Sequence, residues 1–84
     1  MPLFMDVHQS LPEGASADDL FKAHQADLAT QGKYGVKYLN FWGDPEGGKA
    51  FCLVEAPDPE TASAVHREAH GLVADEIYPV AEGA

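Results

Sequence analysis

Apolar and polar residues alternate at the start of the chain. Within residues 3–8, Phe4, Asp6 and His8 share one side of an extended backbone, and the apolar residues between them share the other. A period of two is typical of a β-strand. The pattern predicts a strand with two polar side chains on one face.

The next apolar positions recur at helical spacing. Residues 17–31 form the periodic stretch, and Ser16 precedes Asp19 by three positions, which is the spacing of a capping box. Gly32 suits the end of a helix. We therefore expect a helix over 17–31, with Leu20, Phe21, His24 and Leu28 on its apolar side.

Residues 35–43 and 49–55 are both rich in β-forming side chains, and the segment between them reads DPEGG. Two such runs around a turn segment predict a β-hairpin. A second helix is expected at 59–70, because Asp58 can cap it and Pro59 suits its first position. A last strand is expected at 76–80, at the sheet edge, since Pro79 cannot donate to a β-ladder.

This order of strand, helix, strand, strand, helix, strand is the split βαβ, or ferredoxin-like, pattern. It predicts an α+β fold in which an antiparallel four-stranded sheet carries both helices on one face. Eighty-four residues make a single domain, residues 1–84.

Two predicted strands are apolar on both faces. Residues 38–42 read YLNFW and residues 51–54 read FCLV. If both helices cover one face of the sheet, the other face needs a separate cover. A second copy packed sheet to sheet is the simplest one. The chain is therefore expected to form a homodimer.

The net charge limits the classes of partner that the chain can bind. Fourteen Asp and Glu against five Lys and Arg give a formal net charge of −9, which disfavours binding to nucleic acid and to anionic membranes. No signal peptide or membrane span is recognised, so a cytoplasmic location is expected. The single cysteine, Cys52, excludes an intrachain disulfide and is interpreted as a small buried hydrophobe.

Residues 66–70 read HREAH. His66 and His70 are four apart, so both imidazoles lie on one flank of the second helix. Arg67 occupies the place where the zinc-protease pattern H-E-x-x-H needs its glutamate, which excludes that reading. Such a pair can chelate a divalent ion, although two ligands are too few for tight binding.

The predicted topology brings further polar residues to this pair. The end of the first strand, with Asp6 and His8, should lie near His66 and His70. All four histidines are expected in the half of the domain near the start of the first helix, where His24 is either a core histidine or a ligand.

Four segments resemble an actinobacterial family of small nickel-binding proteins. They are FMDVH at 4–8, QGKYGVKYLNFW at 31–42, FCLVEAP at 51–57 and AVHREAHGLVADEIYPV at 64–80. The resemblance implies a dimeric ferredoxin-like protein that binds Ni²⁺ near its surface and serves in metal sequestration or tolerance, without catalysis. Its motif-borne polar residues, carried over as metal ligands, are Asp6, His8, Glu55, His66 and His70.

Which of these residues share an ion stays open, as does any part for His24 or Glu68. Imidazole and carboxylate ligands suit nickel, and other divalent transition metals such as copper bind them as well. An enzyme of the monooxygenase or isomerase type, with Asp6 and His8 as an acid–base pair in a cleft between helix and sheet, is the alternative. A third possibility is a structural dimer with inactive histidines.

Overall fold

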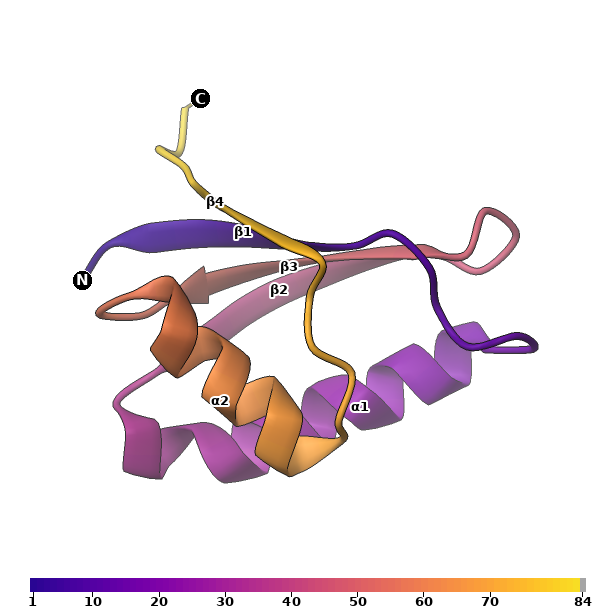
Figure 1. Ribbon diagram of the computed structural model, residues 1–84, viewed down its shortest axis with the longest axis horizontal. Coiled ribbons are helices and arrows are strands. Elements are labelled where there is room, and N and C mark those ends of the chain that lie inside the picture. The colour runs from indigo at the N-terminus through magenta and orange to yellow at the C-terminus, as the bar shows by residue number, and fades with distance from the viewer. Residues whose placement is uncertain (84) are drawn as a thin grey trace.

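The computed structural model describes residues 1–83 and has the expected order of elements (Figure 1). The elements are β1 (Leu3–His8), α1 (Ala17–Thr30), the short 3₁₀ helix η1 (Gln31–Tyr34), β2 (Lys37–Asp44), β3 (Lys49–Glu55), α2 (Pro59–Ala69) and β4 (Glu76–Pro79).

The four strands form one antiparallel sheet in the order β2-β3-β1-β4. Figure 1 shows α1 and α2 on the same side of this sheet. The ferredoxin-like fold is therefore confirmed. The predicted edge position of the last strand is also confirmed, and Pro79 pairs there with Phe4 of β1.

The helix starts use the predicted caps. Ser16 accepts from the backbone N–H of Asp19 at 3.1 Å, and the Asp19 carboxylate accepts from the N–H of Ser16 at 3.0 Å. Asp58 accepts from the N–H of Thr61 at 2.8 Å. Such caps stabilise a helix by roughly 1 kcal/mol each. Within residues 1–83, neither α1 nor α2 combines the length and apolar character that crossing a membrane requires.

The end of α1 differs from the sequence expectation. The chain does not stop at Gly32 but tightens into η1, and Gly35 ends it with a φ of 65°. The N–H groups of Gly35 and Val36 turn back to this segment, both reaching the carbonyl of Gln31. β2 consequently begins at Lys37, two residues later than the apolar pattern indicates.

β2 contains a β-bulge. Tyr38 and Asn40 lie opposite two consecutive residues of β3, Val54 and Leu53, so Leu39 is an extra residue. A bulge of this kind resets the alternation of side chains along a strand. Tyr38 therefore turns towards the helices, where it is buried.

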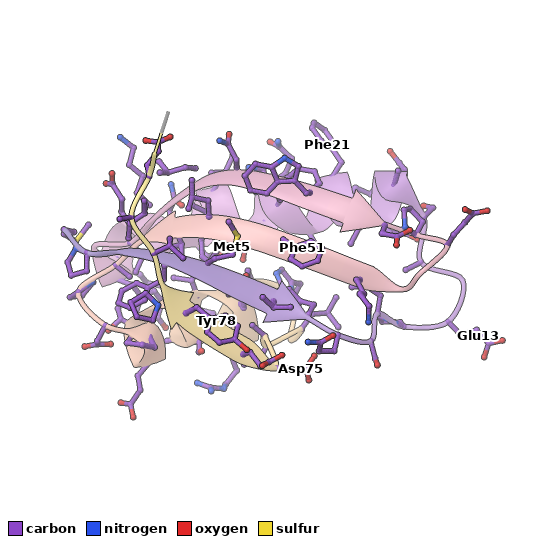
Figure 2. All side chains as sticks on the ribbon, turned by 90° about the horizontal axis from the view of Figure 1, so that it is seen from above. Met5, Glu13, Phe21, Phe51, Asp75 and Tyr78 are labelled. Carbon is purple, nitrogen blue, oxygen red and sulfur yellow. The ribbon has the colours of Figure 1, made fainter. Side chains whose placement is uncertain are left out.

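The core lies between the sheet and the helices. It contains Phe4, Val36, Tyr38, Cys52, Val54, Ala56, Ala62 and Val65. From α1 only Leu20 is a buried apolar residue, whereas Phe21 and Leu28 are 53% and 39% exposed. The apolar side of α1 is thus narrower than the sequence suggested, and Figure 2 shows Phe21 at the outer side of the helix.

The other face of the sheet is apolar and carries no helix within residues 1–83. Figure 2 shows Met5, Phe51 and Tyr78 on this face. Trp42 and Tyr78 are 50% and 48% exposed. This is the surface that the two-sided apolar strands predicted.

Candidate metal centre

His66 of α2 lies between two buried aspartates. Its Nδ1 is 2.8 Å from Asp27 Oδ1, and its Nε2 is 3.0 Å from Asp6 Oδ2. All three residues are at most 2% exposed. Since β1, α1 and α2 supply one residue each, the contacts connect the sheet to both helices.

The charges of this cluster depend on one another. Burial alone would lower the pKa of His66, but the hydrogen bond to Asp27 and the charge of Asp6 outweigh it and raise the pKa to about 9. Burial would raise the pKa of each aspartate, yet contacts with His66 hold both below the ordinary value of 3.8. At neutral pH the cluster therefore holds one imidazolium and two carboxylates.

Tyr38 completes the inner side of the cluster. Its hydroxyl donates to Asp6 Oδ2 at 2.9 Å and lies 3.2 Å from the carbonyl of Ala62. Its ring stacks on His66 with 4.6 Å between centroids. Burial and the charge of Asp6 raise the pKa of Tyr38 far above its ordinary value, so the phenol stays a neutral donor. The bulge in β2 allows the Tyr38 side chain to occupy this place beside His66.

His70 lies at the outer side, at the C-cap of α2. Its Nε2 is 3.1 and 3.2 Å from the two oxygens of Asp27, and its Nδ1 accepts the backbone N–H of Leu72 at 3.0 Å. Because Nδ1 accepts this hydrogen bond, a neutral His70 ring carries its proton on Nε2, which faces Asp27. The side chain is 13% exposed, which makes it the rim of the cluster.

His8 and Cys52 approach Asp6 from the sheet. His8 Nε2 is 3.5 Å from Asp6 Oδ1, and Cys52 is the direct cross-strand neighbour of Asp6. Burial, followed by the charge of Asp6, raises the pKa of the Cys52 thiol. Among the described residues, Asp6 Oδ1 and His66 Nε2 have close neighbours but no hydrogen bond of acceptable geometry.

Two overlapping groups of side chains have metal-ligand atoms within 4.8 Å of one another. We call them the outer group and the inner group. The outer group is Asp27, His66 and His70, and the inner group is Asp6, His8, Cys52 and His66. His66 belongs to both because its two ring nitrogens face opposite sides.

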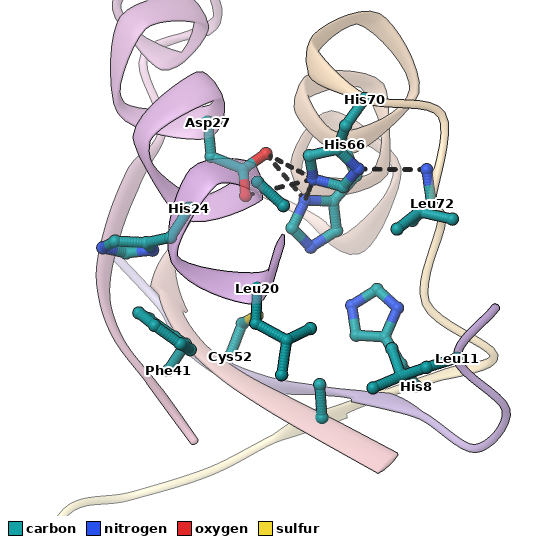
Figure 3. A pocket seen from close by; sticks show the side chains of 12 residues that line it. His8, Leu11, Leu20, His24, Asp27, Phe41, Cys52, His66, His70 and Leu72 are labelled. Atoms are coloured by element: carbon teal, nitrogen blue, oxygen red, sulfur yellow. Dashed lines mark hydrogen bonds and ion pairs between the residues drawn. The ribbon is translucent and has the colours of Figure 1, made fainter. Parts of the chain in front are cut away.

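A small cavity of about 30 Å³ adjoins both groups between α1, α2 and the sheet (Figure 3). All four histidines line it, so the expectation that they gather in one half of the domain is confirmed. Its other lining residues are Leu11, Leu20, Ala23, Asp27, Phe41, Ala50, Cys52 and Leu72.

The structure brings together four of the five predicted ligands, namely Asp6, His8, His66 and His70. Glu55 is separate from them, because it pairs with Leu3 at the opposite end of β1 and belongs to neither ligand group. The resemblance implies ions near the surface, which stays a prediction; of the predicted ligands His70 lies at the rim, and His8 and His66 are 7% and 1% exposed. His66 itself lies inside the core.

The two residues left open lie outside both groups. His24 is half-buried, stacks near Phe41 at 4.8 Å between ring centroids, and its Nδ1 has no partner among the described residues. Glu68 is exposed, forms an ion pair with Lys33, and accepts from the Tyr34 hydroxyl at 2.8 Å. Glu68 thus joins α2 to η1 on the outside.

Asp27 is the member that sequence reasoning missed. Its signal was available, since Asp27 follows Leu20 by seven and His24 by three and so shares their face of α1. A carboxylate on the buried face of a helix needs a partner. That partner is His66, which lies 39 residues further along the chain.

Comparison with known proteins bears on this site. Residues 4–80 match the sequence model of a family described as "Nickel responsive protein SCO4226-like". The solved structure of SCO4226 from Streptomyces coelicolor A3(2) resembles the chain with a TM-score of 0.88 and 43% sequence identity, over 98% of this chain and 99% of that one. No curated protein matches it. The family description names no enzymatic activity.

Proposed function

The chain belongs to the family of SCO4226-like nickel-responsive proteins, and we propose that it binds Ni²⁺ without catalytic turnover. The role we assign is nickel sequestration or tolerance, in a homodimer that packs the apolar sheet faces together. The ligands we propose are histidine and carboxylate side chains of the cluster around His66.

The observation that supports this proposal is the outer group. Asp27, His66 and His70 place one carboxylate and two imidazoles within 4.8 Å of one another, with His70 at the rim. Nickel accepts imidazole and carboxylate ligands. Three protein ligands leave further coordination positions for water, which an ion reaching the rim brings with it.

Charge balance favours a cation here. Two carboxylates and one imidazolium leave a net negative charge in a region that is almost completely buried. An ion that replaces the proton of His66 adds positive charge to this region. Ligating imidazoles must be neutral, so nickel binding releases protons and weakens as pH falls.

An ion at the outer group must also displace existing hydrogen bonds. The proton on His70 Nε2 has to leave, and Nδ1 already accepts the N–H of Leu72. A neutral ring bound through Nε2 carries its proton on Nδ1, which can then no longer accept the N–H of Leu72. The turn at residues 70–72 must therefore rearrange. We propose that this turn changes conformation when nickel binds.

The test is a calorimetric titration of metal-free protein with Ni²⁺. His70→Ala should weaken binding by at least about tenfold, since even partners of metal ligands contribute 10- to 100-fold. His24→Ala is the matched control, because it removes a histidine from the same cavity but from neither ligand group, and it should bind as the parent does. Unchanged binding in His70→Ala would place the nickel elsewhere.

The second candidate function is a small enzyme that uses Asp6 and His8. The cavity between helices and sheet favours it, because catalytic sites are usually apolar pockets with a few polar groups. The contacts of Asp6 oppose it. Its pKa is lowered by His66 and by hydrogen bonds, chiefly those of His66 and His8, which makes it a weak base. If the parent protein turns over a substrate and His8→Ala abolishes that turnover, the enzyme is the correct function.

A further inference from the structure

The inner group has a different ligand chemistry from the outer group. We infer that Asp6, His8, Cys52 and His66 form a four-coordinate site for a thiophilic divalent ion of the zinc type. This inference goes beyond the proposed function, because it concerns another ion, another set of ligand atoms and a role for Cys52.

The backbone of the sheet positions three of the four side chains. Asp6 of β1 and Cys52 of β3 are directly opposite each other, and His8 follows Asp6 by two on the same face. His66 reaches them from α2 above the sheet, 3.0 Å from Asp6 Oδ2. The ligand atoms come from three elements that pack together in the core.

The spacing is close to that of a formed site. Metal bonds of about 2.0–2.3 Å in a tetrahedron separate the ligand atoms by about 3.3–3.8 Å. Asp6 Oδ1 and His8 Nε2 are already 3.5 Å apart, and no pair in the group exceeds 4.8 Å. A contraction of about 1 Å completes the tetrahedron.

One unpaired buried oxygen supports the site independently of the cysteine. Asp6 Oδ1 has no hydrogen-bond partner among the described residues, and the side chain of Asp6 is 0% exposed. A buried polar atom without a partner is destabilising by about 1–3 kcal/mol. An ion bound there supplies the missing partner to Asp6 Oδ1, and it replaces the proton that His66 Nε2 holds towards Asp6 Oδ2.

Asp27 fits as the residue that orients His66. Metal-bound histidines usually donate their other N–H to a carboxylate, which fixes the tautomer. Asp27 Oδ1 is 2.8 Å from His66 Nδ1, so a proton held there leaves the Nε2 lone pair facing the inner group. Asp27 is thus a positioning residue for this site, and an ion in the inner group withdraws His66 from the outer one.

The ligand types select the ion. One thiolate, two imidazoles and one carboxylate in a closed set of four match tetrahedral zinc, whereas the outer group contains no sulfur. The cavity touches His8, Cys52 and His66, which gives the ion a route from the rim (Figure 3).

Cobalt(II) is the probe, because tetrahedral Co²⁺ is coloured and zinc is not. Reduced, metal-free protein titrated with Co²⁺ should develop a thiolate-to-cobalt charge-transfer band and intense visible bands. Both should saturate at one equivalent per chain and disappear when one equivalent of Zn²⁺ is added. Absence of the charge-transfer band in the unmodified protein overturns the inference, without reference to any variant.

Two variants sharpen the result. Cys52→Ser should lose the charge-transfer band, and a band that persists in this variant overturns the inference. His70→Ala should keep the band while nickel binding weakens. If His70→Ala keeps the charge-transfer band and binds nickel as the parent does, the outer nickel site alone is refuted. If its nickel binding weakens but no charge-transfer band forms, the inner site alone is refuted.

Discussion

The two faces of the sheet differ in what they bury and what they expose. The face towards the helices contains Asp6 and His8 in its interior and surrounds them with partners. The opposite face presents Met5 and Phe51 (Figure 2), and Trp42 lies directly opposite Phe51 on the neighbouring strand. No helix of residues 1–83 packs on this face. Charge is buried where apolar cover exists, and apolar surface is left where that cover is missing.

This difference separates the face that holds the protomer together from the face that we propose for dimer contacts. Buried ion pairs are sensitive to geometry, because removing one partner leaves the other charged and desolvated. The burial of an apolar sheet face depends less on exact geometry, because any partner that removes the face from water lowers the free energy. Substitutions on the two faces should therefore differ in what they change.

The largest expected effect is on the covered face. Asp6→Ala removes the acceptor of the Tyr38 hydroxyl and one of the two carboxylates that hold the His66 imidazolium. Loss of one partner from a buried pair typically destabilises by about 3–5 kcal/mol. Urea unfolding of metal-free protein should show a decrease of this size in the free energy of unfolding.

Glu68→Ala is the control for Asp6→Ala. It removes an exposed carboxylate that pairs with Lys33, and exposed pairs contribute about 0–1 kcal/mol. Similar losses in the two variants would contradict the distinction between buried and exposed pairs.

The next effect is a dependence of stability on pH. The folded pKa of His66, about 9, lies above its ordinary value of 6.5, so its stabilisation is complete below pH 6.5 and is lost as pH rises towards 9. The difference corresponds to about 3 kcal/mol. The lowered pKa values of Asp6 and Asp27 act in the opposite sense, with stabilisation present above 3.8 and lost on acidification.

Metal-free protein should therefore be most stable between about pH 4 and 6.5. Urea unfolding at a series of pH values measures this directly. His66→Gln should abolish the decline above pH 6.5, and a parent protein with equal stability at pH 6.5 and pH 9 would contradict the ion-pair assignment.

The third effect tests the open face. Phe51→Asp places a carboxylate in the apolar surface that the proposed dimer buries, and self-association should weaken at least about a hundredfold, or 2.7 kcal/mol. Light scattering over a concentration series measures it. Phe21→Asp is the matched control, since Phe21 is 53% exposed on α1, away from this face. A parent protein that is monomeric at micromolar concentration would refute the dimer.

The fold was predictable because each local signal agreed with the next. The Ser16 capping box, the Asp58 cap with Pro59, and the edge position of Pro79 all appear as expected. Strand alternation around Asp6 was equally direct, since its side chain lies on the same face as those of Phe4 and His8.

The candidate site was predictable only in part. Helical spacing brought His66 and His70 together, and topology brought Asp6 and His8 towards them. Asp27 was missed because its meaning depends on a contact with α2 that no local pattern reports. Glu55 came from the family resemblance alone, and the strand register separates it from the cluster.

The bulge in β2 has a consequence for how this chain tolerates insertions and deletions. Tyr38 and the residues after Leu39 hold their faces only because one extra residue separates them. Deleting residue 39 leaves a strand with normal alternation and an ordinary composition. Yet either the Tyr38 ring or the whole second half of β2 would then point to the wrong side. The number of residues in this strand is therefore constrained more strongly than the identity of the residue at position 39.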